Sequence, residues 1–159
     1  MHILLTGGAG YIGSHAALAV AAAGHHPVLL DDFSNAGRDV VGRLSALAGR
    51  EVPAVEGSIC DPALLASLFA ARPIDAVIHF AAKKSVAESV ADPLAYYANN
   101  VGGMITLLEA MDSAAVRTIV FSSSATVYGD PDVLPIAEDH PLRPVNPYGE
   151  TKLACETIL

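Results

Sequence analysis

Short apolar runs alternate along the chain with longer segments of helical periodicity. The apolar runs predict β-strands, at residues 2–5, 27–30, 51–56, 74–80 and 117–122. The segments between them predict helices, at residues 16–23, 38–48, 61–71 and 92–111, and a last helix follows residue 146. The third run contains a proline, which is typical of an edge strand. The fourth is strongly apolar, which is typical of a strand buried on both faces.

The same kind of residue pair marks the start of three of the predicted helices. Asp61-Pro62, Asp92-Pro93 and Asn146-Pro147 each place a capping side chain before a proline at the first helical position. A regular alternation of strands and helices calls for a parallel sheet with right-handed crossovers. We therefore predict an α/β fold, a Rossmann-like doubly wound sheet with strand order 3-2-1-4-5. Its ligand crevice is expected at the carboxyl ends of strands 1 and 4, where the strand order reverses.

Composition narrows the class of protein. The chain has 159 residues, 52% hydrophobic and 16% charged, as expected for one globular domain. A net charge of −8 argues against nucleic-acid binding, and the apolar runs are far shorter than a membrane span. Cys60 and Cys155 are isolated and the histidines are scattered. We therefore expect no metal site and a reduced, cytoplasmic setting.

A glycine-rich turn joins the first strand to the first helix. Its glycines can be read as G-x-G-x-x-G through Gly8, Gly10 and Gly13, or as G-x-x-G-x-x-G starting at Gly7. Glycine lets the backbone turn tightly and approach a diphosphate, and the free N–H groups at a helix start then face the anion. A glycine turn without a ligand is the alternative. The position between a strand and a helix favours dinucleotide binding.

An acidic residue ends the second strand. Asp31 lies eighteen residues after Gly13, close to the spacing at which a carboxylate accepts hydrogen bonds from the adenosine ribose. A carboxylate at that place repels a 2′-phosphate, so the spacing favours NAD over NADP. The alternative is that Asp31 only ends the strand.

A tyrosine and a lysine lie four residues apart near the start of the last predicted helix. Tyr148 and Lys152 therefore share one helix face, and a nearby ammonium lowers the pKa of a phenol towards that of a useful base. Ser124, after the fifth strand, can share the proton of an alcohol substrate. The pair alone is common on helix surfaces, Ser122 and Ser123 can equally cap backbone groups, and Lys83 is expected to be a solvated surface residue.

Together these motifs resemble a known family. They comprise the glycine turn with its flanking Thr6, Tyr11, Ile12, Ser14 and His15, then residues 31–35, 79–82, 121–129 and 148–152. This set resembles the extended short-chain dehydrogenase/reductase family and, within it, the UDP-glucose 4-epimerase subfamily. The resemblance covers the whole chain. The tyrosine–lysine pair specifies only the superfamily, whereas the Ser-Ala-Thr-Val-Tyr-Gly run is more specific.

The resemblance implies a reaction and its residues. UDP-glucose and UDP-galactose would be interconverted by hydride abstraction and return at C4′, with NAD regenerated in each cycle. Tyr148 would be the base on the sugar 4′-hydroxyl, Ser124 its hydrogen-bond partner and Lys152 its tuning cation, so Ser124 and Tyr148 also bind the UDP-sugar substrate. The implied NAD-binding residues are Gly7, Gly10, Tyr11, Ile12, Gly13, Asp31, Asp32, Phe33, Ser34, Asn35, Ser58, Ile59, Phe80, Ala81, Ala82, Lys84, Asn99, Ser122, Tyr148 and Lys152.

The chain departs from the family pattern at two positions. Ser58 stands where aspartate is common against the adenine, which weakens that expected contact. Lys83 stands where an apolar residue is usual and adds a charge beside Lys84. A third comparison concerns the reaction. Nucleotide-sugar dehydratases carry acidic residues after the equivalent of Ser124, and Ala125 and Thr126 do not supply them.

The resemblance also implies that family members extend further. Residues 1–159 would form an incomplete NAD-binding domain whose sheet stops at strand 5, without the C-terminal domain that binds the UDP-sugar. We expect the chain alone to be inactive, and the full-length protein to be a homodimer. Two alternatives remain: another NAD-dependent nucleotide-sugar enzyme (a pentose 4-epimerase, 4,6-dehydratase or decarboxylase), or a non-catalytic NAD-binding module.

Overall fold

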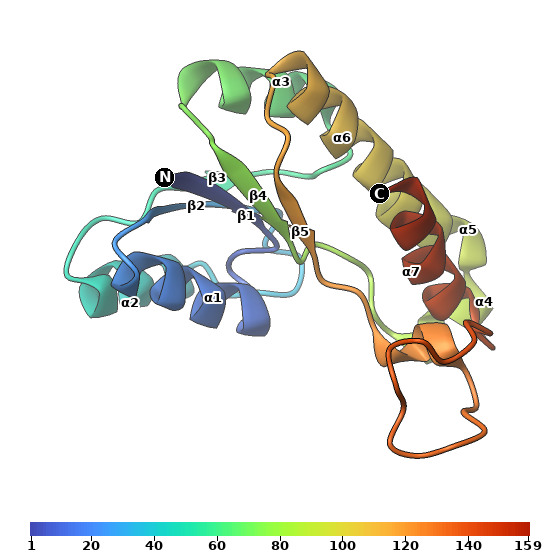
Figure 1. Ribbon diagram of the computed structural model, residues 1–159. Helices are drawn as coiled ribbons and strands as arrows, with labels where there is room; N and C mark the ends of the chain where they lie inside the picture. Colours follow the sequence, from blue (N-terminus) through green and yellow to red (C-terminus); the bar gives the residue numbers. More distant parts are fainter. The chain divides into compact units, whose positions relative to one another are not determined.

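A five-stranded parallel sheet forms the core of the computed structural model, which describes residues 1–159 (Figure 1). The strand order is β3-β2-β1-β4-β5, so the predicted order 3-2-1-4-5 is confirmed. Each neighbouring pair of strands is parallel. The strands are β1 (His2–Thr6), β2 (His26–Asp31), β3 (Ala54–Glu56), β4 (Ala76–His79) and β5 (Ile119–Phe121).

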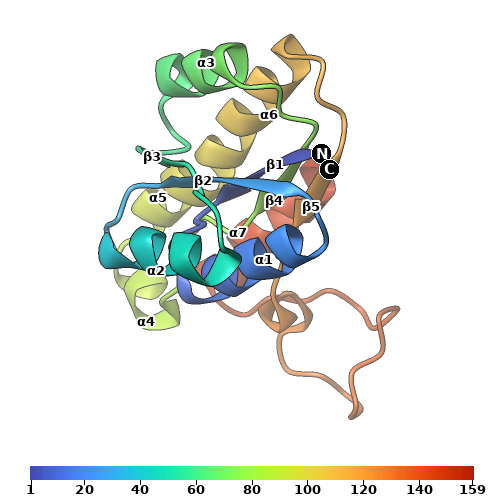
Figure 2. The same cartoon turned by 90° about the vertical axis from the view of Figure 1, so that its left-hand side faces the viewer.

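Helices cover both faces of this sheet, as a doubly wound fold requires. Figures 1 and 2 show α1 (Tyr11–Ala22) and α2 (Asp39–Ala48) on one face. On the other face lie α3 (Pro62–Ala71) and α6 (Gly103–Ser113). None of the helices is both long enough and apolar enough to cross a lipid bilayer.

The alternation of side chains along each strand explains the two layers of the core. Successive residues of β1 point to opposite faces, so Ile3 and Leu5 pack in the cluster that includes Leu44 of α2. Leu4 points the other way and packs in the cluster that includes Leu65 of α3 and further residues of α6. Because both faces are buried, the strand is apolar at every one of these positions.

The predicted helix caps are present. Asp61 accepts the N–H groups of Ala63 and Leu64, each at 3.0 Å, before Pro62 begins α3. Asp92 accepts one N–H group at 3.2 Å, and Asn146 caps the last helix with a bond of 2.9 Å to the N–H of residue 149. Local sequence chemistry therefore fixes where these helices begin.

The chain folds into two compact units, which we describe separately. The first comprises residues 1–81 and 105–122 and holds the sheet. The second comprises residues 82–104 and 123–159. Its elements are α4 (Val86–Ala91), α5 (Pro93–Tyr96), the π-helical segment η1 (Tyr97–Gly102), the 3₁₀ turn η2 (Ala125–Tyr128) and α7 (Pro147–Ile158).

Two features of the second unit differ from the predictions. Helix α4 was not predicted, although the Ser85 side chain accepts the Glu88 N–H as an N-cap. The single helix predicted over residues 92–111 is instead divided into α5, η1 and α6. The π-helical segment contains Asn99 and Asn100, whose weak helix propensity makes a departure from α-helical geometry less costly.

Candidate active site

The glycine turn is built so tightly that three of its positions exclude any side chain. Gly7 has φ +65°, and a Cβ there would lie 2.7 Å from the backbone nitrogen of Ala81. At Gly8 a Cβ would lie 2.7 Å from the carbonyl oxygen of Leu5, and at Gly13 one would meet the backbone of Gly7 and Gly8. The protein's own packing therefore requires these glycines.

Gly10 differs from the other glycines of the turn. A Cβ built there would meet only one atom within 4 Å, the Gly7 carbonyl oxygen at 3.2 Å, so the position is much less crowded than those of Gly7, Gly8 and Gly13. Gly10 is also the N-cap of α1, and no side chain caps this helix. The next two residues, Tyr11 and Ile12, are exposed. A bare backbone beside uncapped helical N–H groups suits the diphosphate of a dinucleotide, so the residues present fit that group.

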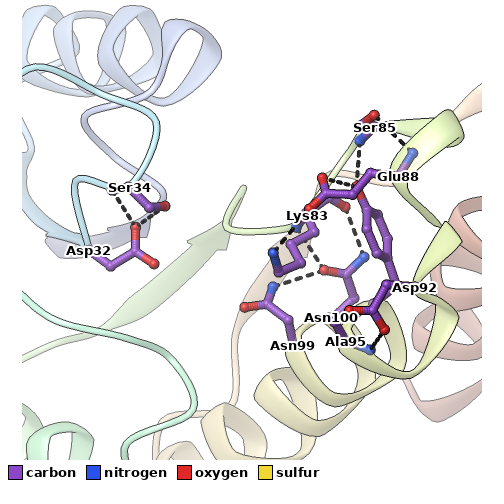
Figure 3. Close-up of polar contacts among 10 residues, drawn as sticks. Asp32, Ser34, Lys83, Ser85, Glu88, Asp92, Ala95, Asn99 and Asn100 are labelled. Carbon is purple, nitrogen blue, oxygen red and sulfur yellow. Dashed lines mark hydrogen bonds and ion pairs between the residues drawn. The ribbon is translucent and has the colours of Figure 1, made fainter.

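The Asp31 carboxylate connects the glycine turn to the end of β2. Its Oδ2 accepts the Ala9 N–H and its Oδ1 accepts the Phe33 N–H, both at 2.9 Å. The carboxylate is half-buried and keeps further lone pairs for ligand hydroxyls. Its neighbour Asp32 accepts two hydrogen bonds from Ser34, at 2.6 and 2.9 Å (Figure 3). Both aspartates therefore shape the Asp31–Asn35 segment.

Other predicted residues of the first unit lie at strand ends. The Phe80 N–H donates to the Thr6 carbonyl at 3.0 Å, which holds the end of β4 beside the glycine turn. The Ser122 N–H donates to the His79 carbonyl at 3.1 Å. A buried contact of 2.5 Å between Thr6 Oγ1 and His79 Nδ1 supports the same edge. Sequence reasoning assigned no role to this contact.

The two predicted residues after β3 have different surroundings. Ser58 is half-buried, and its Oγ accepts the Cys60 N–H at 3.1 Å. Ile59 is only 4% exposed and packs in the core cluster on the α3 and α6 face of the sheet. A contact from Ile59 to a ligand would therefore use its backbone.

In the second unit, Asn100 holds the segment that follows β4. Its Oδ1 accepts the Lys83 N–H at 2.8 Å and its Nδ2 donates to the Lys83 carbonyl at 3.0 Å, so one amide fixes both backbone groups of that residue. Asn99 donates to the same Oδ1 at 3.0 Å (Figure 3). The Asn100 amide also donates to Thr151 Oγ1 of α7 at 3.0 Å. The only signal for Asn100 in the sequence is an asparagine pair inside a predicted helix.

Lys83 has a partner of opposite charge. Its Nζ lies 3.5 Å from Oε1 of Glu88, and the other oxygen of Glu88 accepts the Tyr96 hydroxyl at 2.9 Å. The same hydroxyl accepts the Ser85 N–H at 2.9 Å. Burial, together with donation to Glu88, raises the pKa of the Tyr96 phenol above its ordinary value. Lys83 is therefore half-exposed, and its charge is balanced by the Glu88 carboxylate, so it is not simply a solvated surface lysine as expected.

Ser124 is the N-cap of η2. Its Oγ accepts the Thr126 N–H at 3.2 Å and the Thr126 hydroxyl at 2.9 Å. Neither bond uses the proton of Ser124, which stays available for a ligand oxygen. The adjacent Ser123 donates instead to the Glu156 carboxylate of α7. Ser124 thus has a donor to spare, whereas Ser123 uses its own.

Helix α7 carries the tyrosine–lysine pair. Lys152 is only 4% exposed, and burial lowers the pKa of its ammonium from 10.5 to about 8, against a smaller opposing effect of the Cys155 thiol. Tyr148, four residues earlier, is half-buried. At neutral pH Lys152 is still mostly protonated, so it presents a dehydrated cation on the helix turn after Tyr148. Such a cation favours an ionised phenol.

The buried charge of Lys152 has a measurable cost in stability. The pKa of Lys152 is lower in the folded chain than in the unfolded chain, so the unfolded chain binds more protons between pH 8 and 10.5 and stability rises across this range. We expect Lys152→Met to be more stable than the parent at pH 7 by up to about 3 kcal/mol. That difference should shrink towards pH 10.5.

Urea unfolding at a series of pH values measures this effect. Lys84→Met is the matched control, because Lys84 is exposed. A Lys152→Met variant that follows the parent at every pH would contradict the assignment.

The structure brings the predicted residues together in two groups. The first unit joins the glycine turn, the Asp31–Asn35 segment and Phe80-Ala81. The second unit joins the residue 82–85 segment, Asn99 and the first turns of α7 through Asn100. Each group is thus organised by hydrogen bonds within its own unit.

Comparison with known proteins gives the family. A model of the family described as GDP-mannose 4,6 dehydratase matches residues 4–159. The chain belongs to this family. The curated relatives of the chain include several UDP-glucose 4-epimerases. That of Bacillus subtilis (strain 168) is 50% identical over 159 residues, which is 100% of this chain and 47% of that protein. That of Yersinia pestis is 51% identical over 160 residues, which is also 100% of this chain and 47% of that protein.

Solved structures of UDP-glucose 4-epimerases are similar to this chain over almost its whole length. The UDP-glucose-4-epimerase from Stenotrophomonas maltophila, with bound NAD and formylated UDP-arabinopyranose, has a TM-score of 0.96 and 46% identity over 99% of this chain and 47% of its own. The enzyme from Bifidobacterium longum, in complex with NAD⁺ and UDP, has a TM-score of 0.97 and 42% identity, over 99% and 48%. The predicted resemblance is confirmed, and the chain spans about half the length of these relatives.

Proposed function

We propose that this chain is the NAD-binding portion of an enzyme that interconverts UDP-glucose and UDP-galactose. The observation that carries the proposal is the Tyr148–Lys152 pair, in which a cation with only 4% exposure stands one turn after a half-buried phenol. Burial of an ammonium is unfavourable, so an incidental tyrosine–lysine pair on a helix surface would keep its lysine in water. Burial of Lys152 is expected where the cation stabilises a phenolate.

The chemistry follows from the side chains. Tyr148 takes the proton of the sugar 4′-hydroxyl, because Lys152 lowers the free energy of the phenolate. The Ser124 hydroxyl, whose proton is free, donates to the same sugar oxygen and orients it. NAD, when bound, supplies the oxidation of C4′ and its later reduction. Return of the proton by Tyr148 completes the exchange, so the protein groups end as they began.

The residues of the first unit would hold most of the dinucleotide. The Gly10 backbone and the N–H groups of Tyr11 and Ile12 suit the diphosphate. Asp31 would accept the hydroxyls of the adenosine ribose while it keeps its bonds to Ala9 and Phe33. The remaining contacts would come from Asp32–Asn35, Ser58, Ile59, Phe80–Ala82, Lys84, Asn99, Ser122, Tyr148 and Lys152.

A dehydratase is the second candidate, because the matching family model carries that description. Loss of water from a sugar needs an acidic group to protonate the departing hydroxyl. The residues beside Ser124 are Ala125 and Thr126, and the Thr126 hydroxyl is engaged with Ser124. This chemistry supports epimerisation over dehydration.

The proposal extends to the organisation of the whole protein. Residues 1–159 would form one NAD-binding domain, with the UDP-sugar held mainly by sequence beyond it. The chain alone is then expected to bind NAD without turning over UDP-galactose. The whole protein is proposed to act as a cytoplasmic homodimer.

Cofactor binding by the chain itself tests the proposal. We expect NADH fluorescence to rise and saturate on addition of the chain, and NADPH to bind at least about tenfold more weakly because Asp31 repels the 2′-phosphate. Asp31→Asn should reduce this preference for NADH over NADPH, while Asp39→Asn, at an exposed carboxylate outside the proposed NAD contacts, serves as the control. Absence of NADH binding would reject the proposal. Equal affinity for the two nucleotides would reject the role of Asp31.

A further inference from the structure

Thr151, which stands between Tyr148 and Lys152 in the sequence of α7, is fully buried, and its hydroxyl makes two hydrogen bonds. The hydroxyl donates to the Tyr148 carbonyl at 2.7 Å, within α7. It accepts from the Asn100 amide at 3.0 Å, from a residue 51 positions away in the chain. A hydroxyl has one proton and two lone pairs, so it can fill both roles at once. Neither a purely donating nor a purely accepting side chain can do so.

The Asn100 amide has no spare capacity for a different arrangement. Its two N–H bonds go to the Lys83 carbonyl and to Thr151, and its oxygen accepts from Lys83 and Asn99. Loss of the Thr151 hydroxyl would therefore leave a buried N–H without an acceptor, which the structure must relieve by movement or by water entry. Such movement or water entry would occur at the residue next to Lys152 in α7.

Two other contacts hold the same part of α7. Gly149 lies so close to η2 that a Cβ there would be 2.8 Å from the Thr126 carbonyl oxygen. Six residues later the Cys155 thiol donates to the Asn100 carbonyl at 3.5 Å. Thr151 lies between Gly149 and Cys155 on the helix. Its hydrogen bond to Asn100 is the polar contact that is closest in the sequence to both Tyr148 and Lys152.

We propose that Thr151 is a positioning residue, whose hydroxyl, held by the Asn100 amide, fixes the α7 turn that presents Tyr148 and Lys152. The proposal rests on the function proposed for that pair. Through Asn100 the same hydroxyl connects this turn to the backbone of Lys83, next to Lys84. One buried hydrogen-bond network therefore sets the spacing between a predicted cofactor contact and the proposed base. The important property of Thr151 is its oxygen, not its volume.

This distinction decides the choice of variants. Thr151→Val keeps the branched shape and removes the oxygen. Thr151→Ser keeps the oxygen and removes a methyl group. Thr157→Val is the matched control, because the Thr157 hydroxyl donates in the same way to a backbone carbonyl of α7, at 2.9 Å. Unlike Thr151, Thr157 is exposed and does not bond to Asn100. Thr151→Ala, which cannot clash with its surroundings, repeats the test if the valine variant does not fold.

The chain has only three lysines, Lys83, Lys84 and Lys152, so the ammonium of Lys152 can be followed by NMR with ¹³C-labelled lysine. In the parent we expect it to titrate with a pKa of about 8. In Thr151→Val, entry of water beside the loosened turn should move the midpoint upward, towards the ordinary 10.5 of a lysine. Thr151→Ser and Thr157→Val should titrate like the parent.

The outcomes separate this proposal from the proposed function. A Thr151→Val variant that is folded and titrates like the parent overturns the positioning role. The same holds if Thr151→Ser shifts as far as Thr151→Val, because the methyl group would then matter more than the oxygen. NADH binding by the unchanged parent chain is measured separately. Its absence overturns the proposed function without affecting the lysine titration.

Discussion

Tyr148→Phe is expected to lower epimerase turnover by about a thousandfold and to leave NADH binding within twofold of the parent. Phenylalanine preserves the half-buried ring on α7 and removes only the oxygen that takes the proton. Lys152 then has no phenolate to stabilise, although its own burial is unchanged. Because the chain alone is expected to be inactive, turnover is measured in a chimera. In it, residues 1–159 replace the matching part of the Bacillus subtilis relative, which is 50% identical.

Tyr97→Phe is the control for this experiment. Tyr97 lies in the same unit, is exposed and belongs to η1 rather than α7. Its variant should turn over UDP-galactose at the parental rate. If Tyr148→Phe kept a tenth or more of the activity, another group would have to take the proton. If it lost NADH binding as well, the main role of Tyr148 would be to hold the cofactor.

The fold was predictable from the sequence because its determinants are short-range and redundant. Apolar runs, proline-marked helix caps and the right-handed crossover leave few arrangements besides the observed order. The missed helix α4 has only one local signal, the pair of Ser85 and Glu88, in six residues. The π-helical turn at η1 has only a weak local signal, the low helix propensity of Asn99 and Asn100. The contacts that Asn100 makes with distant segments cannot be read from the sequence.

The candidate site likewise has a part that local sequence predicts and a part that depends on long-range contacts. The glycine turn was predictable because a tight turn restricts residue type at each position, whatever the rest of the chain does. The burial of Lys152 and the network of Asn100 and Thr151 were not, because they depend on pairs separated by 17 and 51 residues. Sequence spacing put Tyr148 and Lys152 on one helix face. Only the structure shows that Lys152 on this face is buried and that α7 is hydrogen-bonded, through Asn100, to the segment after β4.

Gly7→Ala is the second change with a large expected effect, and it acts on the fold and the cofactor together. Alanine at φ +65° is strained by about 1 kcal/mol. Its Cβ would also lie 2.7 Å from the Ala81 nitrogen and 2.9 Å from the Ala81 Cα, so backbone must move, at a further cost of about 3 kcal/mol. We expect a total loss of about 4 kcal/mol in the free energy of unfolding.

Gly49→Ala separates the two causes of this loss. Gly49 ends α2 in the same unit with the same φ of +65°, but a Cβ there meets nothing within 4 Å. In Gly49→Ala the backbone strain alone should lower the free energy of unfolding, by about 1 kcal/mol, and the variant should bind NADH like the parent. Gly7→Ala should instead bind NADH at least tenfold more weakly, because the displaced turn carries the Gly10 backbone and the start of α1. Urea unfolding and NADH fluorescence measure both effects. Equal losses in the two variants would mean that the close approach of Gly7 to Ala81 does not determine the turn.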